Sequence, residues 1–261
     1  MFRPFEDAPH GAATTVVASS GFSMVMPVEL VVARTDLIDA ATFLRLRAGL
    51  PADRRERCDA YYVEHDRHAS ALTFALLQWL WQERHGAGPM PHVERAANGK
   101  PRFVGAAGFE FNLSHDARAC VCAVASVPIG VDVQSRVSFD DALFERIAAP
   151  AELALRERFR RLGDLAWLWS RKEAVVKQSG VGLRAPLQSI DALTESGLVS
   201  FAVDGIDAVI SVSVDGAVND GFLGCCRVRL IEPIKPVNEM MSSVVWRERV
   251  LLPVPLQAAG L

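Results

Sequence analysis

Residues 167–177 read Trp-Leu-Trp-Ser-Arg-Lys-Glu-Ala-Val-Val-Lys, and the rest of the chain is best interpreted outward from this stretch. No glycine or proline interrupts residues 165–179, and this apolar-rich run predicts a helix. Trp169, Glu173 and Lys177 are spaced four residues apart, so they share one face of that helix. Taken alone, the pattern is typical of a solvated surface helix whose Glu–Lys pair contributes about 0.2–0.5 kcal/mol.

The composition is that of a globular protein with ample core material. Half of the 261 residues are hydrophobic, 23% are charged, and the net charge is −3. This length suits one large domain or two of ordinary size. The slight negative charge argues against a general nucleic-acid-binding protein, which usually carries a broad basic excess. The five cysteines are odd in number and lack zinc-site spacing, which predicts buried thiols in a reducing compartment.

The N-terminal sequence predicts neither a secretory signal nor a membrane span. Residues 1–7 are acidic where a signal peptide would be basic. The apolar run at 16–33 is too broken for a membrane span, because it is interrupted by Ser19, Ser20, Gly21, Pro27 and Glu29. We therefore expect a cytoplasmic protein that contacts no membrane.

Hydrophobic periodicity predicts short strands alternating with helices. Strands are expected at 25–33, 109–115, 119–125, 128–133, 200–203, 208–214 and 224–230, and helices at 36–48, 52–81, 139–148, 151–162 and 165–179. The close spacing of the strands at 119–125 and 128–133 predicts a hairpin. The order indicates an α+β fold of two halves. The expected segments are a flexible leader at 1–22, subdomains at 23–130 and 131–232, and a tail at 233–261.

Three further motifs contain residue types that carry chemistry. They are Asn98-Gly-Lys-Pro101, Phe111-Asn-Leu-Ser-His-Asp116 and Gly130-Val-Asp-Val-Gln134. Each is weak alone, because a Gly-Lys-Pro turn is ordinarily only a turn. His115 is more often a satisfied polar histidine than a catalyst. Asp132 lies in an apolar strand, where a buried carboxylate needs a partner or a metal, or holds a loop at the strand end.

In this order and spacing, the helix and the three motifs resemble those of the Sfp-type 4′-phosphopantetheinyl transferases. That family combines a Gly-Lys-Pro turn, a Phe-Asn-(Ile/Leu)-Ser-His segment, a Gly-(Ile/Val)-Asp-(Ile/Val) strand and a Trp-x-x-Lys-Glu-x-x-x-Lys helix. The segment Gly180-Val-Gly-Leu183 also matches the family pattern, and the resemblance covers roughly residues 25–230. It implies two pseudosymmetric α+β subdomains with the active site between them.

The resemblance also implies a reaction. Members of the family transfer the 4′-phosphopantetheine arm of coenzyme A to a serine of an acyl or peptidyl carrier protein and release adenosine 3′,5′-bisphosphate. The carrier could serve fatty acid synthesis, or secondary metabolite biosynthesis of polyketide, nonribosomal peptide or siderophore type. The family implies a monomer, because the two halves already form the cleft.

By resemblance, Asp132 and Glu173 bind Mg²⁺ or Mn²⁺. Many members have a glutamate as a third ligand two residues after the strand aspartate, and Gln134 occupies that position here. An amide oxygen can coordinate magnesium weakly or hold a coordinated water. The implied catalytic residues are Glu173 as the base for the serine, Lys177 beside the leaving phosphate, and His115.

The remaining implied contacts are to coenzyme A. The residues assigned to it by resemblance are Arg54, Arg57, Lys100, Pro101, Ser114, His115, Lys172 and Lys177. Arg54 and Arg57 lie where the family places basic residues for the 3′-phosphate, although a solvated helix start would have the same composition. Where the family often has an arginine on the early helix, this chain has Ala69, and Arg67 nearby is a weak candidate to replace it.

Two other interpretations stay open at this point. A catalytically weak relative could bind coenzyme A or a carrier domain without turnover, and Gln134 is the residue that favours it. An unrelated magnesium-dependent phosphoesterase could use Asp132 and His115, but the turn and the helix would then be coincidental. A serine hydrolase of the Gly-x-Ser-x-Gly type is excluded, because the chain lacks that motif.

Overall fold

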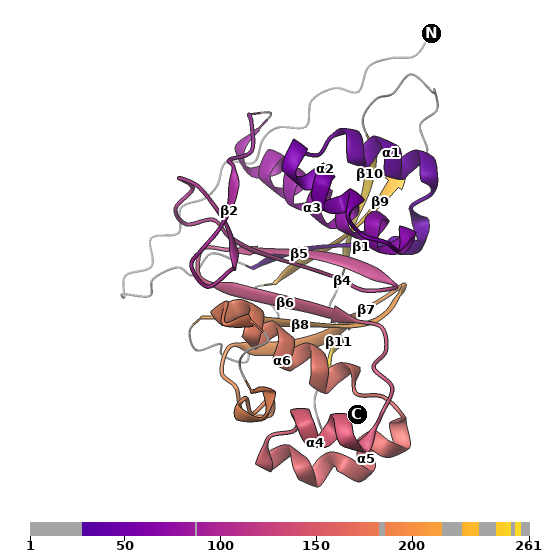
Figure 1. Ribbon diagram of the computed structural model, residues 1–261, viewed down its shortest axis with the longest axis vertical. Coiled ribbons are helices and arrows are strands. Elements are labelled where there is room, and N and C mark those ends of the chain that lie inside the picture. The colour runs from indigo at the N-terminus through magenta and orange to yellow at the C-terminus, as the bar shows by residue number, and fades with distance from the viewer. Residues whose placement is uncertain are drawn as a thin grey trace.

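Two β-sheets stacked face to face form the centre of the fold, with helices on their outer faces (Figure 1). The computed structural model describes residues 28–86, 88–182, 186–215, 226–234, 244–251 and 254–256. The predicted α+β fold is confirmed. The leader expected at 1–22 lies outside the described residues.

The first sheet has the strand order β10-β9-β1-β5-β4. Its strands are β1 (Glu29–Arg34), β4 (Glu110–His115), β5 (Ala119–Ala125), β9 (Arg227–Ile234) and β10 (Val245–Leu251). Strand β9 runs parallel to β1, and the other neighbours are antiparallel. Its outer face carries the helices α1 (Ala40–Ala48), α2 (Ala52–Asp59) and α3 (Glu64–His85). A small hairpin of β2 (Val93–Arg95) and β3 (Pro101–Phe103) lies beside them.

The second sheet has the order β11-β7-β8-β6, all antiparallel. Its strands are β6 (Ile129–Gln134), β7 (Leu198–Val203), β8 (Ile206–Val214) and β11 (Val254–Pro255). The outer face is covered by α6 (Ala166–Ser179), the predicted tryptophan helix. The remaining elements of this half are α4 (Asp141–Ile147), α5 (Arg156–Leu162) and the 3-10 turns η2 (Pro150–Leu155) and η4 (Leu187–Ser189); η1 (Thr35–Leu37) follows β1.

Strand β5 is buried over its whole length because both of its faces are covered. Cys120 and Cys122 pack into the core beneath α3, whereas Val121 and Ala123 pack into the core between the two sheets. The alternation of side chains along a strand therefore divides one continuous apolar run between two cores. Burial raises the pKa of the Cys120 thiol to about 12, so this thiol stays protonated.

The predicted hairpin of residues 119–125 and 128–133 is wrong. The first run is β5, between β1 and β4, and the second is β6, which pairs with β8 in the other sheet. The intervening residues carry the chain from one sheet to the other, and an apolar pattern alone cannot distinguish this crossing from a hairpin.

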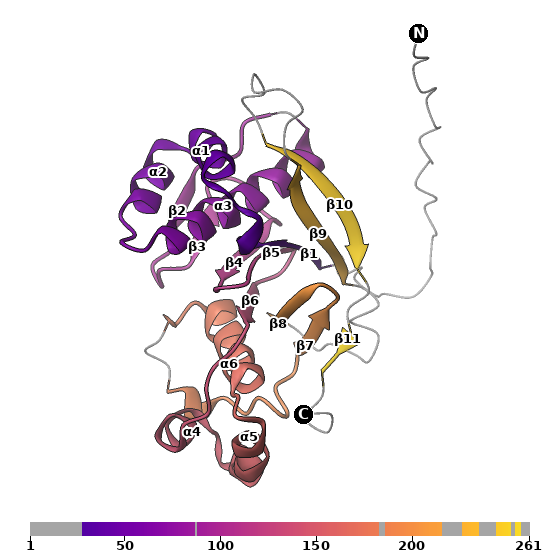
Figure 2. The same ribbon diagram turned by 90° about the vertical axis from the view of Figure 1, so that its right-hand side faces the viewer.

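The last described strands also connect the two sheets. Residues 227–232, expected in the second half, belong to β9 in the first sheet, where β10 extends the edge (Figure 2). Within the expected tail, β11 pairs with β7 of the second sheet. The rest of the expected tail, at 235–243, 252–253 and 257–261, lies outside the described residues.

Gly130 allows β6 and α6 to approach each other closely. A Cβ at this position would lie 2.0 Å from the carbonyl oxygen of Ala174 and 2.3 Å from the backbone nitrogen of Gln178. No side chain fits there, which explains the glycine in the Gly-Val-Asp motif. Asp132, on the same face of β6 as Gly130, is thereby brought to the residues of α6.

Candidate active site

Three of the predicted site residues meet in one buried hydrogen-bonded group. Asp132 is 2% exposed, and its Oδ1 accepts hydrogen bonds from Ser114 Oγ at 2.8 Å and Lys177 Nζ at 2.5 Å. Lys177 Nζ also donates to Ser114 Oγ at 2.9 Å. The three side chains come from β6, β4 and α6. The contact therefore joins an edge strand of each sheet to the helix, as a site between two halves requires.

Two carboxylate oxygens beside this group are buried without a partner. Asp132 Oδ2 and Glu173 Oε1 have no hydrogen-bond partner among the described residues. Burial raises the pKa of Glu173, the charge of Asp132 adds to that effect, and Lys177 opposes it. The two carboxylates are thus close enough to interact. A buried carboxylate oxygen left unpaired is costly unless a ligand completes it.

A pocket of about 220 Å³ opens at this place, and the predicted Gly-Lys-Pro turn forms part of its wall. Its lining includes Lys100, Pro101, Glu173 and Lys177. Lys100 Nζ donates to the backbone oxygens of Ile129 at 2.9 Å and of Gln178 at 3.0 Å. Lys100 thus ties β6 to α6 as well as lining the pocket, and burial lowers the pKa of its ammonium.

His115 ends β4 directly after Ser114. Burial lowers the pKa of its imidazole, and the positive charge of Lys177 lowers it further. The neutral imidazole is therefore favoured in the protein alone. An anionic group bound near both side chains would favour the protonated form.

Lys172 requires a correction. Its ammonium is fully buried and pairs with Glu152 Oε2 at 2.7 Å, and it also donates to the backbone oxygens of Leu187 and Ile190. The prediction that Lys172 contacts phosphate oxygens is therefore wrong in this arrangement. Lys172 is adjacent to Glu173 in sequence, but the turn of the helix directs it toward η2 and the segment before β7. Glu152 was missed because nothing in the sequence connects it to the helix.

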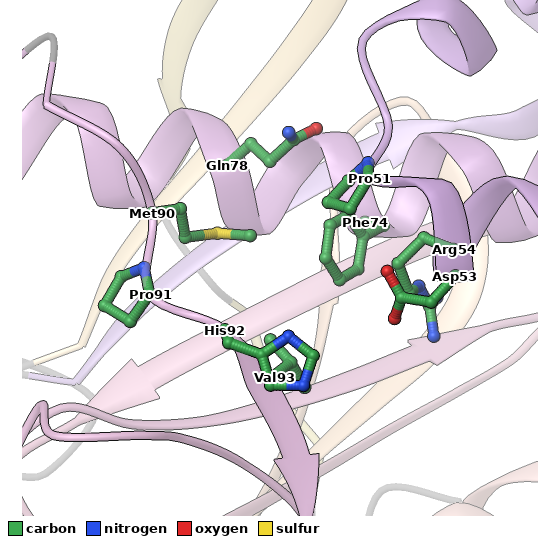
Figure 3. Close-up of a pocket in the computed structure, with 9 residues that line it drawn as sticks. All are labelled: Pro51, Asp53, Arg54, Phe74, Gln78, Met90, Pro91, His92 and Val93. Atoms are coloured by element: carbon green, nitrogen blue, oxygen red, sulfur yellow. The ribbon is translucent and has the colours of Figure 1, made fainter.

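Arg54 lies in a different pocket, of about 310 Å³, between α2, α3 and residues 90–93 (Figure 3). Its guanidinium is 4.4 Å from the ring centre of Phe74, and its Nε is buried without a partner among the described residues. Burial lowers the pKa of Arg54, and the neighbouring charge of Arg57 adds to this. Arg57 is exposed on the same helix. The structure describes no residue that lines both pockets, so the assignment of these arginines to the 3′-phosphate stays a prediction.

The sequence comparisons identify the family of the chain. The model of the 4′-phosphopantetheinyl transferase superfamily matches residues 128–215, which include Asp132, Glu173 and Lys177. A 4′-phosphopantetheinyl transferase of Bacillus subtilis is 31% identical over 161 residues, which cover 60% of this chain and 72% of the relative. The chain belongs to this family. The predictions of the family and of a transferase are confirmed.

Other phosphopantetheinyl transferases are also similar to this chain. The transferase Sfp of Bacillus subtilis strain 168 is 27% identical over 161 residues, with 60% of this chain and 72% of Sfp covered. A phosphopantetheinyl transferase of Thraustochytrium sp. is 31% identical over 206 residues, covering 70% of this chain and 67% of the relative.

The site of this phosphopantetheinyl transferase fits a magnesium ion by the chemistry of its donors. Mg²⁺ in phosphate chemistry is typically bound by one or two carboxylates, with waters and substrate phosphates completing its octahedron. Asp132 Oδ2 and Glu173 Oε1 are such donors, and both lack another partner among the described residues. The part of the chain that is described holds no cluster of three or more His, Cys, Asp or Glu side chains suited to a metal. The residues therefore supply two carboxylates, and Gln134 at the end of β6 stays a predicted third contact.

Proposed function

We propose that this phosphopantetheinyl transferase moves the phosphopantetheine arm of coenzyme A onto a serine hydroxyl of an apo acyl or peptidyl carrier protein, in a Mg²⁺-dependent reaction. The observation that carries the proposal is the pair of buried, unpartnered carboxylate oxygens beside Lys177. Such a group is suited to a metal–pyrophosphate complex and is unusual as a purely structural feature.

The chemistry follows from the positions of the side chains. Glu173 accepts the proton of the attacking serine, because its carboxylate lines the pocket and keeps one buried oxygen without a hydrogen-bond partner among the described residues. The serine oxygen forms a bond to the β-phosphorus while the bond to the leaving phosphate oxygen breaks. Lys177 provides positive charge for that leaving group. When bound, Mg²⁺ held by Asp132 and Glu173 would neutralise pyrophosphate charge.

The remaining contacts concern the nucleotide side of coenzyme A. Ser114 and His115 lie at the end of β4 next to Lys177, and Lys100 and Pro101 line the pocket that contains Glu173. Their hydroxyl, imidazole and ammonium groups are suited to phosphate oxygens. We further propose a monomer that acts in the cytoplasm. The buried thiols of Cys58, Cys120 and Cys122 agree with a reducing compartment. No described helix is long and apolar enough to cross a membrane.

The direct test is to incubate the protein with coenzyme A, Mg²⁺ and several apo carrier domains and to weigh each carrier. We expect a mass gain of one phosphopantetheine group, which is lost when the metal is removed with a chelator. Coenzyme A binding without any mass gain would instead identify the catalytically weak relative. Equal transfer in the presence of the chelator would reject the metal assignment.

A further inference from the structure

Strands β4 and β6 lie at the edges of the two sheets, where they face each other beside the site. Strand β4 is the last strand of the first sheet and β6 the last of the second. Every second N–H group of an edge strand points away from its own sheet and needs another acceptor. In β6 these groups include those of Val131, Val133 and, just beyond the strand, Ser135.

Side chains of the Asn-Leu-Ser-His-Asp segment accept all three of these N–H groups. Val131 donates to Asn112 Oδ1 at 3.0 Å, and Val133 donates to Ser114 Oγ at 3.3 Å. Ser135 donates to Asp116 Oδ2. Each acceptor lies 19 residues before its donor, so the three contacts are successive rungs of one ladder. Side chains of β4 and of Asp116, the residue that follows it, thus replace the backbone pairing that would otherwise join the two sheets.

Asp116 connects more elements than the other two rungs. Its Oδ1 accepts from the backbone nitrogens of Arg118 at 2.7 Å and Ala119 at 2.9 Å, in the turn between β4 and β5. Its backbone oxygen lies 3.3 Å from Nε2 of His65 at the start of α3. One carboxylate therefore fixes the end of β4 and the end of β6 at the same time.

We propose that Asp116 is a positioning residue for the transfer reaction, acting through the distance between the two strand ends. This inference rests on the proposed function. Ser114 and His115 precede Asp116 on one strand, and Asp132 and Gln134 precede its partner Ser135 on the other. The Asp116–Ser135 contact fixes how closely these two sets approach. When it is lost, only the two rungs at Val131 and Val133 hold β6 against β4, so the strand ends can separate and the free oxygen of Asp132 is placed less tightly relative to Glu173.

The test compares Asp116→Asn with Asp140→Ala. Asparagine preserves the size of the side chain but has one acceptor oxygen, so it cannot hold both the turn and Ser135. Asp140 caps α4, where its Oδ1 accepts from the nitrogen of Leu143 at 2.8 Å, away from the site residues. Loss of this cap lowers the thermal midpoint of unfolding and leaves the hydrogen bonds between β4 and β6 unchanged. Asp140→Ala therefore controls for loss of stability alone.

The first measurement is the affinity for Mn²⁺ in the presence of coenzyme A, determined by electron paramagnetic resonance. This binding measurement requires no transfer reaction. We expect Asp116→Asn to weaken Mn²⁺ binding about tenfold, at the lower end of what outer residues contribute at metal sites. Amide exchange at Ser135 should become faster. Asp140→Ala should leave the Mn²⁺ affinity unchanged.

The second measurement is carrier transfer with the same three proteins. We expect Asp116→Asn to lower kcat while the KM for the carrier stays within about twofold, because a misplaced metal site impairs the chemical step. Unchanged Mn²⁺ affinity and kcat, with faster exchange at Ser135, would show that Asp116 is structural only and would overturn the inference. Failure of the unmodified protein to transfer phosphopantetheine would reject the proposed function instead. The Mn²⁺ affinities would still show whether Asp116 positions the metal ligands.

Discussion

Lys172 and Lys177 of helix α6 each pair with a carboxylate from another element, and the two pairs differ in their surroundings. Lys172 and Glu152 are 2.7 Å apart and fully buried. Lys177 and Asp132 are 2.5 Å apart, and the lysine is 27% exposed. In the first pair, Glu152 also accepts the backbone nitrogens of Ala149 and Ala192, both at 2.6 Å. In the second, Asp132 Oδ2 has no partner among the described residues.

The difference separates a structural ion pair from a site. Both oxygens of Glu152 are used, so the pair can hold η2, α6 and the segment before β7 together but cannot bind anything else. The carboxylates of Asp132 and Glu173 each keep an oxygen free beside a partly exposed cation. Buried carboxylate oxygens without a partner cost stability, and a protein retains them where a ligand binds to them.

The largest effect is expected from Glu173→Ala. This change removes a proposed metal ligand and the proposed base at once, and general base catalysis alone contributes about 10²- to 10⁴-fold. We expect carrier transfer to fall at least about a thousandfold, while the thermal midpoint stays the same or rises because a buried charge is removed. The measurement is the initial rate of carrier mass gain, with calorimetry for stability. Normal transfer would refute the role of Glu173 even within the right family.

The second effect is on stability, through Lys172→Met. This change leaves Glu152 as a buried charge without its partner, which costs about 3–5 kcal/mol. Chemical unfolding followed by tryptophan fluorescence measures the loss. The double variant Lys172→Met with Glu152→Gln should recover part of it, because no net charge is then left buried and an acceptor oxygen remains.

The Lys172→Met variant also tests whether Lys172 takes part in the reaction. The molecules that remain folded should transfer phosphopantetheine at nearly the normal rate, since Lys172 does not face the pocket. If transfer falls more than about tenfold at a temperature where the variant is folded, then Lys172 contributes more than the 1.4 kcal/mol which that factor represents to the reaction. It would then be the phosphate contact that the sequence pattern suggests.

Lys172 also shows where sequence reasoning stops. The spacing within 165–179 was enough to predict the helix and to place Glu173 and Lys177 on one face. An apolar strand around Asp132 was enough to predict that this carboxylate needs a partner. The partner of Lys172 lies in a 3-10 turn of an earlier segment, and only the packed structure brings Glu152 to the helix. Local patterns give the direction of a side chain on its own element but not what it meets.

The same limit applies to the sheets. The strand at 119–125 and the strand at 128–133 were both predicted, but their pairing was not, because β6 pairs with the distant β8. The parallel pairing of β1 with β9 joins opposite ends of the chain and has no local signal. The acceptor ladder from Asn112 to Asp116 is equally invisible in sequence, since its meaning depends on which edges meet.

A third prediction concerns Gln134→Glu, which adds a carboxylate at the end of β6. If position 134 faces the metal, an added negative charge should lower the Mg²⁺ concentration for half-maximal transfer, by about tenfold for one further ligand of this kind. The measurement is transfer rate against Mg²⁺ concentration. A matched control is Gln188→Glu, on the 3-10 turn η4, where the amide donates to the backbone oxygen of Glu145. An unchanged half-maximal concentration would show that residue 134 lies outside the metal site.

The smallest effect is expected for the pH dependence of stability through His115. Burial and the charge of Lys177 lower the pKa of His115 in the folded protein. The folded state therefore disfavours protonation, so this contribution to stability is present above the ordinary histidine pKa and is lost as the pH falls below it. Between about pH 7.5 and about pH 5.5, the native protein should lose more unfolding free energy than His115→Asn. Urea unfolding at both pH values measures the difference, with the exposed His92→Asn as control. Equal losses in all three proteins would mean that His115 is not held neutral beside Lys177. The Lys177–Asp132 pair would then have no electrostatic interaction with His115.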